Sequence, residues 1–154
     1  MPDPLLETWQ IHNRINLYLL RAVSAPGLSV APLSGGRSVA QIFAHIHNVR
    51  LMWLEAAGTP TPRSVTKLDK DAKLTVATLT KALEASGETV GSLVQSALDA
   101  GGRVKGFKPH VHAFVGYLIS HESHHRGQAT MVLKAAGAPL DKKIAYGLWE
   151  WGVR

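Results

Sequence analysis

The chain has 154 residues, of which 45% are hydrophobic and 18% charged, a composition typical of a globular protein that excludes a disordered chain. It contains no cysteine, which excludes disulfides, thiolate zinc sites and a cysteine nucleophile. Its net charge of +6 comes from scattered basic residues without interleaved aromatic ones, so the charge favours no nucleic-acid partner.

The first helix is predicted over Leu5 to Ala22, where apolar residues recur at helical spacing with polar residues between them. Pro26 lies in the segment that ends it. Ser38 is a predicted N-cap with Gln41 as its capping-box partner, so a second helix begins there and runs to about Ala57. The Pro/Gly-rich segment between these two helices predicts a long loop at one end of the fold.

A third helix is predicted from Asp69 or Lys70 to about Ala100, and a fourth from Pro109 to about Ala136. The aromatic tail, residues 144–151, is predicted to form a short helix or an extended cover. No segment alternates polar and apolar residues as strands do. The pattern therefore predicts an all-α fold, an antiparallel four-helix bundle with a short C-terminal extension.

Domain organisation and compartment follow from length and from what the chain lacks. The length fits one domain spanning residues 1–154. No segment resembles a signal peptide, and no apolar run reaches the roughly 18 residues of a membrane span. We therefore expect a cytoplasmic protein with no membrane partner.

Two histidines of the fourth predicted helix carry the strongest chemical signal. His121 and His125 are four residues apart, so on a helix they share a face and can reach one metal ion. They continue a stripe with Phe114, Leu118 and Val132, which predicts that they face the core. A lone core histidine is more often simply hydrogen-bonded, so the pair needs support from another helix.

The second predicted helix offers that support. His45 lies on the apolar stripe of this helix, whereas His47 is displaced from it and is predicted to be lateral or exposed. His124 is predicted at the edge of its stripe or on the surface. Three inward histidines, one from the second helix and two from the fourth, would form a metal site with open positions, which is typical of catalysis.

Two motifs resemble those of the DinB-like (DinB/YfiT) family of proposed metalloenzymes. The run His121 to Gln128 (HESHHRGQ), followed by Leu133 to Gly137 (LKAAG), resembles the last-helix motif of that family. Ser38 to Ile46 (SVAQIFAHI), ending in Trp53 and Leu54, resembles its second-helix motif. The resemblance covers essentially the whole chain and implies a four-helix bundle with a metal ion near one end.

The resemblance also implies a ligand set and a chemistry. By position, the metal-binding histidines of the family match His45, His121 and His125, with His47 as the alternative ligand on the second helix. The implied cofactor is a divalent metal ion, most often zinc or nickel, and the implied assembly is a homodimer. The characterised relatives are transferases and isomerases that use low-molecular-weight thiols such as bacillithiol or mycothiol.

We therefore expect a metal-dependent transferase that takes a small-molecule thiol and an electrophilic substrate. Because the chain has no cysteine, the thiol must come from outside the protein. Arg126 or Arg50 could pair with a carboxylate of the co-substrate, although a surface ion pair is the commoner role of such arginines. Glu122 follows a predicted ligand but points sideways from it, so the sequence assigns no catalytic residue.

Three other functions fit the same residues. A metal-dependent hydrolase would use the ion to activate water instead of a thiol. A non-catalytic metal-binding or stress-response interaction module would function through its surface. A ligand-binding protein without turnover would hold its ligand under the aromatic tail of Trp149 and Trp151, although such tryptophans are more often part of the core.

Overall fold

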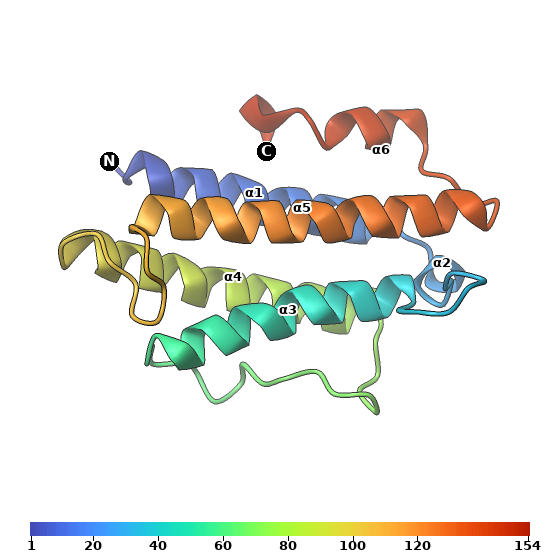
Figure 1. The fold of residues 1–154 in the computed structure, drawn as a ribbon. Helices are drawn as coiled ribbons and strands as arrows, with labels where there is room; N and C mark the ends of the chain where they lie inside the picture. The colour runs from blue at the N-terminus through green and yellow to red at the C-terminus, as the bar shows by residue number, and fades with distance from the viewer.

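The computed structural model describes residues 1–154 as helices joined by loops, with no strand (Figure 1). The four long helices are α1 (Pro4–Ala22), α3 (Val39–Ala56), α4 (Val76–Asp99) and α5 (Val111–Ala135). The short elements are α2 (Ala25–Leu28), α6 (Lys142–Gly147) and a final 3-10 turn, η1 (Trp151–Val153). This confirms the predicted all-α fold with a short C-terminal extension. None of the helices has the length and hydropathy that crossing a membrane would require.

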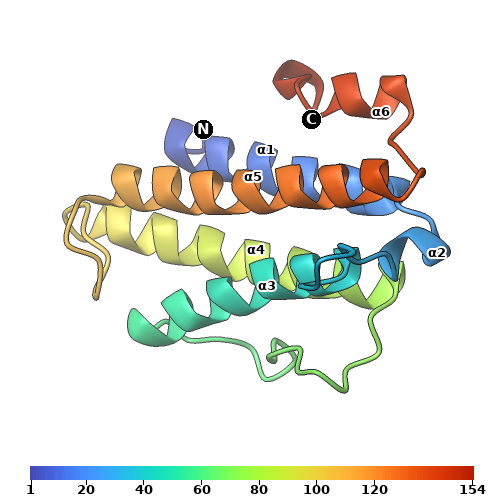
Figure 2. The same ribbon diagram turned by 45° about the vertical axis from the view of Figure 1, so that its right-hand side comes forward.

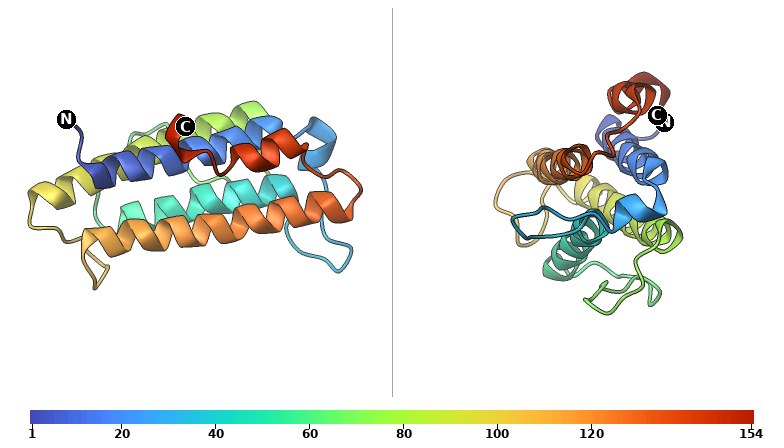
Figure 3. Two further views of the ribbon diagram at one scale, coloured as in Figure 1. Left: turned by 90° about the horizontal axis from the view of Figure 1, so that it is seen from above. Right: turned by 90° about the vertical axis from the view of Figure 1, so that its right-hand side faces the viewer.

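The four long helices form a bundle in which α1 and α3 both pack against α4 and α5. The end-on view in Figure 3 shows α1 and α3 diagonally opposite each other. Helices α1 and α5 run in one direction, and α3 and α4 run in the other (Figures 1 and 2). The neighbouring helices α3 and α4 are therefore parallel, and the loop of residues 57–75 returns the chain along the bundle.

Capping explains where the helices begin. Ser38 and Gln41 form the predicted capping box of α3, with hydrogen bonds of 2.9 and 3.2 Å. Helix α4 begins at Val76, later than the predicted Asp69 or Lys70, because Thr75 accepts the backbone N–H of Thr78 as its N-cap. His110 caps α5 in the same way, so Pro109 lies outside that helix.

The core consists of two apolar clusters separated by a polar layer. One cluster lies near α2 and includes Leu19, Phe43 and Leu83, and the other lies towards the opposite end and includes Trp9 and Phe114. Between them, each long helix contributes buried polar side chains: His12, Asn16, His47, Arg50, Ser86, Thr89, Glu122 and His125. Buried polar groups need hydrogen-bond partners, so the side chains of this layer must bond to one another or to the backbone.

Candidate metal centre

The structure brings His45 of α3 together with His121 and His125 of α5. One ring nitrogen from each lies within 4.8 Å of those from the other two. The ring centroid of His45 lies 5.3 Å from that of His121 and 4.6 Å from that of His125. The Nε2 atoms of His121 and His125 are 3.1 Å apart. Two helices that are far apart in sequence thus supply three converging imidazoles.

This arrangement fits a bound transition metal. Two nitrogens bound about 2.0–2.1 Å from one zinc ion lie roughly 3–3.4 Å apart, and the His121–His125 separation falls in that range. The group contains only imidazoles, a donor set suited to zinc, nickel, copper and iron rather than to calcium or magnesium. Three protein ligands leave coordination positions open for a substrate.

Hydrogen bonding sets the orientation of His125. Its Nδ1–H donates to Oε1 of Gln128 over 2.8 Å, which leaves the Nε2 lone pair facing His121 and His45. Nδ1 of His121 is buried without a hydrogen-bond partner in the protein. Gln128 lies one turn beyond His125 on α5, so the helix itself places this supporting contact.

The electrostatics of the site favour neutral rings. Burial is the main cause that lowers the pKa of all three histidines below the usual 6.5. The pKa of His45 is lowered to about 4, first by burial and then by the positive charge of Arg37. Arg37 is exposed in the loop before α3 and lowers the pKa of His121 and His125 as well. Neutral imidazoles at pH 7 offer lone pairs without first releasing a proton.

Glu122 occupies the position on α5 that the sequence assigned to the metal-binding stripe. The buried stripe runs through Phe114, Leu118, Glu122 and His125, whereas His121 lies at its edge and is partly exposed. Glu122 does point sideways from His121, as predicted, but it points into the bundle interior. The prediction that His121 faces the core was wrong in part, because Glu122 takes the buried position next to it.

Four hydrogen bonds hold the Glu122 carboxylate. Arg50 donates from Nε to Oε1 over 2.6 Å and from Nη2 to Oε2 over 2.9 Å. Asn16 donates to Oε2 over 2.7 Å, and His12 Nε2 lies 2.6 Å from the same atom. The charge of Arg50 and these hydrogen bonds lower the pKa of Glu122, against the opposing effect of burial. Arg50 is thus committed to Glu122 and is not free to pair with a co-substrate.

Two other residues differ from their predicted roles. His47 is buried rather than lateral or exposed, because its two ring nitrogens face the backbone carbonyls of Thr66 and Ala82 at 2.8 and 3.1 Å. Both nitrogens point away from the triad, so His47 makes a poor replacement for His45. Arg126 donates to Asn16 Oδ1 over 2.6 Å and lies on the α1 side of α5, while the triad faces α3. His124 is exposed, as predicted.

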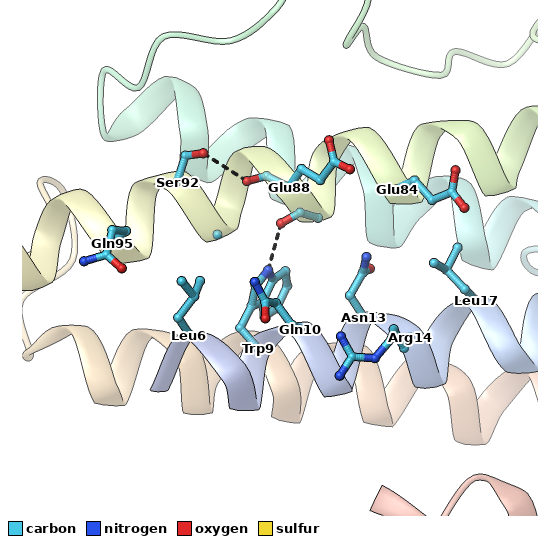
Figure 4. A pocket seen from close by; sticks show the side chains of 12 residues that line it. Leu6, Trp9, Gln10, Asn13, Arg14, Leu17, Glu84, Glu88, Ser92 and Gln95 are labelled. Carbon is cyan, nitrogen blue, oxygen red and sulfur yellow. Dashed lines mark hydrogen bonds between the residues drawn. The ribbon is translucent and has the colours of Figure 1, made fainter. Parts of the chain in front are cut away.

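The main pockets of the surface lie elsewhere. The largest, about 610 Å³, is a groove between α1 and α4 lined by Trp9, Asn13, Glu84 and Glu88 (Figure 4). None of the four main pockets is lined by His45, His121 or His125. His45 and His121 are partly exposed, so the triad is accessible from the surface.

Comparison with known proteins identifies relatives of the whole bundle. The model of the DinB family matches residues 1–150. A crystal structure of a DinB-like protein from Bacillus cereus superposes with a TM-score of 0.71 and 20% sequence identity, covering 89% of this chain and 93% of that chain. No curated protein matches the sequence. The likeness to the solved structure shows a shared fold.

Proposed function

The chain belongs to the DinB family, and on this premise we propose that it binds one divalent metal ion through His45, His121 and His125. We propose further that it is a transferase that uses a low-molecular-weight thiol. The observation that supports the metal site is the convergence of three imidazole nitrogens within 4.8 Å, with no acid or thiolate among them. The family resemblance supports the use of a low-molecular-weight thiol as co-substrate.

The side chains around the triad support a thiolate co-substrate. Three neutral ligands leave a divalent ion its full charge, which lowers the pKa of a bound thiol or water. Gln128 keeps the lone pair of His125 directed into the site. Arg37 supplies an exposed positive charge close to all three histidines and would pair with a carboxylate of the co-substrate.

The hydrogen bonds that Glu122 already accepts favour thiol transfer over hydrolysis. Glu122 is the only carboxylate that acts on the pKa of His121 and His125, and its oxygens already accept four hydrogen bonds. Activation of water usually relies on a nearby general base. A thiol, being far more acidic than water, loses its proton on the metal without one.

Elemental analysis tests the metal site. The protein is reconstituted with zinc or nickel, desalted and compared with a His121→Ala/His125→Ala variant. We expect about one equivalent of metal in the wild type and almost none in the variant, because one remaining imidazole holds a metal weakly. His124→Ala is the matched control, since His124 is exposed beside His125, and it should retain the metal. Equal metal in wild type and double variant would contradict the site.

A cobalt-loaded protein tests the thiol. Titration with N-acetylcysteine should produce a thiolate-to-cobalt charge-transfer band if the sulfur binds the metal. Arg37→Ala should weaken the titration with N-acetylcysteine, which carries a carboxylate, but not the titration with neutral 2-mercaptoethanol. A spectrum unchanged by either thiol would overturn the thiol proposal while leaving the metal site intact. We also propose that the chain forms the homodimer that the family resemblance implies, which sedimentation equilibrium would test.

A further inference from the structure

A second pocket lies on the opposite side of α5 from the triad. It has a volume of about 510 Å³ and lies between α5 and the C-terminal segment, with its wall formed mainly by Arg126, Met131, Lys134, Leu148, Trp149 and Trp151. The top view in Figure 3 shows the C-terminal segment lying alongside α1 and α5. His125 faces His45 of α3, whereas its neighbour Arg126 contacts Asn16 of α1. The pocket and the triad are therefore distinct sites on one helix.

The charged side chains that line this pocket are all positive. Arg126 and Lys134 are both part of the wall, which contains no aspartate or glutamate. Neither residue takes part in a salt bridge. The charge of Glu122 acts on Arg126, but its carboxylate is hydrogen-bonded by Arg50 and not by Arg126. A partly buried cation without a carboxylate partner is costly, because burial removes it from water.

Two N–H groups of the Arg126 guanidinium have no hydrogen-bond partner in the protein. Its five N–H groups include three with partners in the protein: Asn16 Oδ1 at 2.6 Å, Ser123 Oγ at 3.0 Å and His12 Nδ1 at 3.3 Å. The Nε–H and one Nη2–H have none, and Nε is not among the buried atoms that lack a partner, so it is open to solvent. The bonds to α1 fix the guanidinium in place, and its free donors remain able to bind an anion.

The other wall of the pocket is apolar and open to solvent. Trp149 is 80% exposed and Met131 is 64% exposed, although both have large apolar side chains. Grouped exposed apolar residues mark binding surfaces, and an aromatic ring beside methionine suits an aromatic or branched ligand. The volume of the pocket falls within the range of small-molecule sites.

We propose that this pocket binds a small organic carboxylate with an aromatic or branched apolar body. The carboxylate pairs with Arg126, Lys134 adds positive charge about two turns further along α5, and the apolar body packs against Trp149, Trp151 and Met131. Charge complementarity selects an anion, and the shape and apolar wall select a ligand that is not simply an inorganic ion. The proposal does not depend on the metal, because none of the triad histidines lines the pocket.

Isothermal titration calorimetry tests the proposal with 4-phenylbutyrate and its neutral isostere 4-phenylbutanamide. The carboxylate should bind saturably with one site per chain, and the amide should bind about tenfold more weakly or worse. Lys134→Gln should weaken carboxylate binding and leave amide binding unchanged, whereas Trp149→Ala should weaken both. Both side chains are exposed, so neither variant should disturb folding. Lys143→Gln is the matched control, because Lys143 is exposed and lies outside the pocket wall.

The Arg126→Gln variant gives the largest expected loss for the carboxylate, and its thermal unfolding is measured beside its binding because Arg126 also contacts α1. Binding that persists in the His121→Ala/His125→Ala variant separates this pocket from the metal site. Carboxylate binding that is absent, or that Lys134→Gln and Trp149→Ala leave unchanged, would overturn the proposal. So would a Trp149→Ala variant that changes the oligomeric state without any carboxylate binding, since the pocket would then be an interface between copies.

Discussion

Arg50 of α3 holds Glu122 of α5 through two hydrogen bonds of 2.6 and 2.9 Å, with side chains that are 0% and 1% exposed. His45 comes from the same helix as Arg50, and His121 directly precedes Glu122. The ion pair therefore fixes the spacing and register of the two helices that supply the candidate metal ligands. It positions the triad without contributing a ligand to it.

We predict that Glu122→Gln costs about 3–5 kcal/mol of unfolding free energy, because it leaves the charge of Arg50 buried without an opposite charge. Urea denaturation measures the loss. Glu84→Gln is the control, since it breaks the surface pair of Glu84 with Arg21, whose side chains are 48% and 56% exposed, and should cost at most about 1 kcal/mol. Similar losses in the two variants would show that the buried pair is not a special contributor.

We predict that Gln128→Ala lowers metal affinity about 10- to 100-fold, because His125 loses the acceptor that orients its ring. Gln128→Glu retains an acceptor at the same place and should bind metal at least as tightly as the wild type. Competition with a chromogenic zinc chelator measures both affinities. If the alanine and glutamate variants bind equally, the hydrogen bond to His125 does not support the site.

The helices were predictable because each depends on its own sequence. Apolar spacing located all four long helices, and Ser38 with Gln41 marked the start of α3 correctly. The late start of α4 was missed because residues 69–75 carry helix-compatible spacing, while Thr75 and Thr78 cap the helix further along. Local hydrogen bonding there outweighs periodicity.

The polar layer was not predictable from single helices. Periodicity indicates which side of a helix faces inward, but it treats a buried charge as improbable unless its partner is known. Glu122 is buried only because Arg50, His12 and Asn16 lie at the same level in other helices. The placement of His47 likewise depends on two backbone carbonyls from distant segments. One signal was present: polar residues interrupt the apolar stripe at a matching level in each long helix.

The buried His12 should make the metal-free protein less stable in mild acid. Its pKa is lowered from 6.5, chiefly by burial and against the attraction of Glu122, with Arg126 and Arg50 also lowering it. The hydrogen bonds of His12 also fit a neutral ring, since Nε2–H donates to Glu122 and Nδ1 faces an N–H of Arg126. The unfolded chain therefore binds this proton more readily than the folded protein does. The contribution of His12 to the free energy of unfolding therefore falls as the pH drops below about 6.5.

We predict that His12→Gln removes up to about 1.4 kcal/mol per pH unit of this slope as the pH falls below roughly 6.5. Glutamine keeps an N–H donor for Glu122 but does not titrate. Urea denaturation of metal-free protein at several pH values measures the slope, with the exposed His112→Gln as the control that should retain it. An unchanged slope in His12→Gln would mean that other groups take up the proton.

Helices α1 and α4 approach each other closely at Gly87. Trp9 Nε1 donates to the backbone carbonyl of Gly87 over 2.9 Å, and Asn13 faces the same turn of α4 (Figure 4). A Cβ at Gly87 would lie only 2.6 Å from Asn13 Cγ, closer than real Cβ atoms come to their neighbours. Gly116 is also inside a helix, but a Cβ there would meet nothing within 4 Å.

We predict that Gly87→Ala is roughly neutral, because turning the flexible Asn13 side chain aside into the groove offsets the gain in helix propensity of about 1 kcal/mol. Gly116→Ala should instead stabilise it by about 0.5–1 kcal/mol, since only the propensity gain applies there. In an Asn13→Ala background, Gly87→Ala should stabilise the protein about as much as Gly116→Ala does, because the atoms that the new Cβ would strike are absent. Thermal unfolding compares the variants. Equal effects at the two glycines would show that α1 and α4 are not packed this closely.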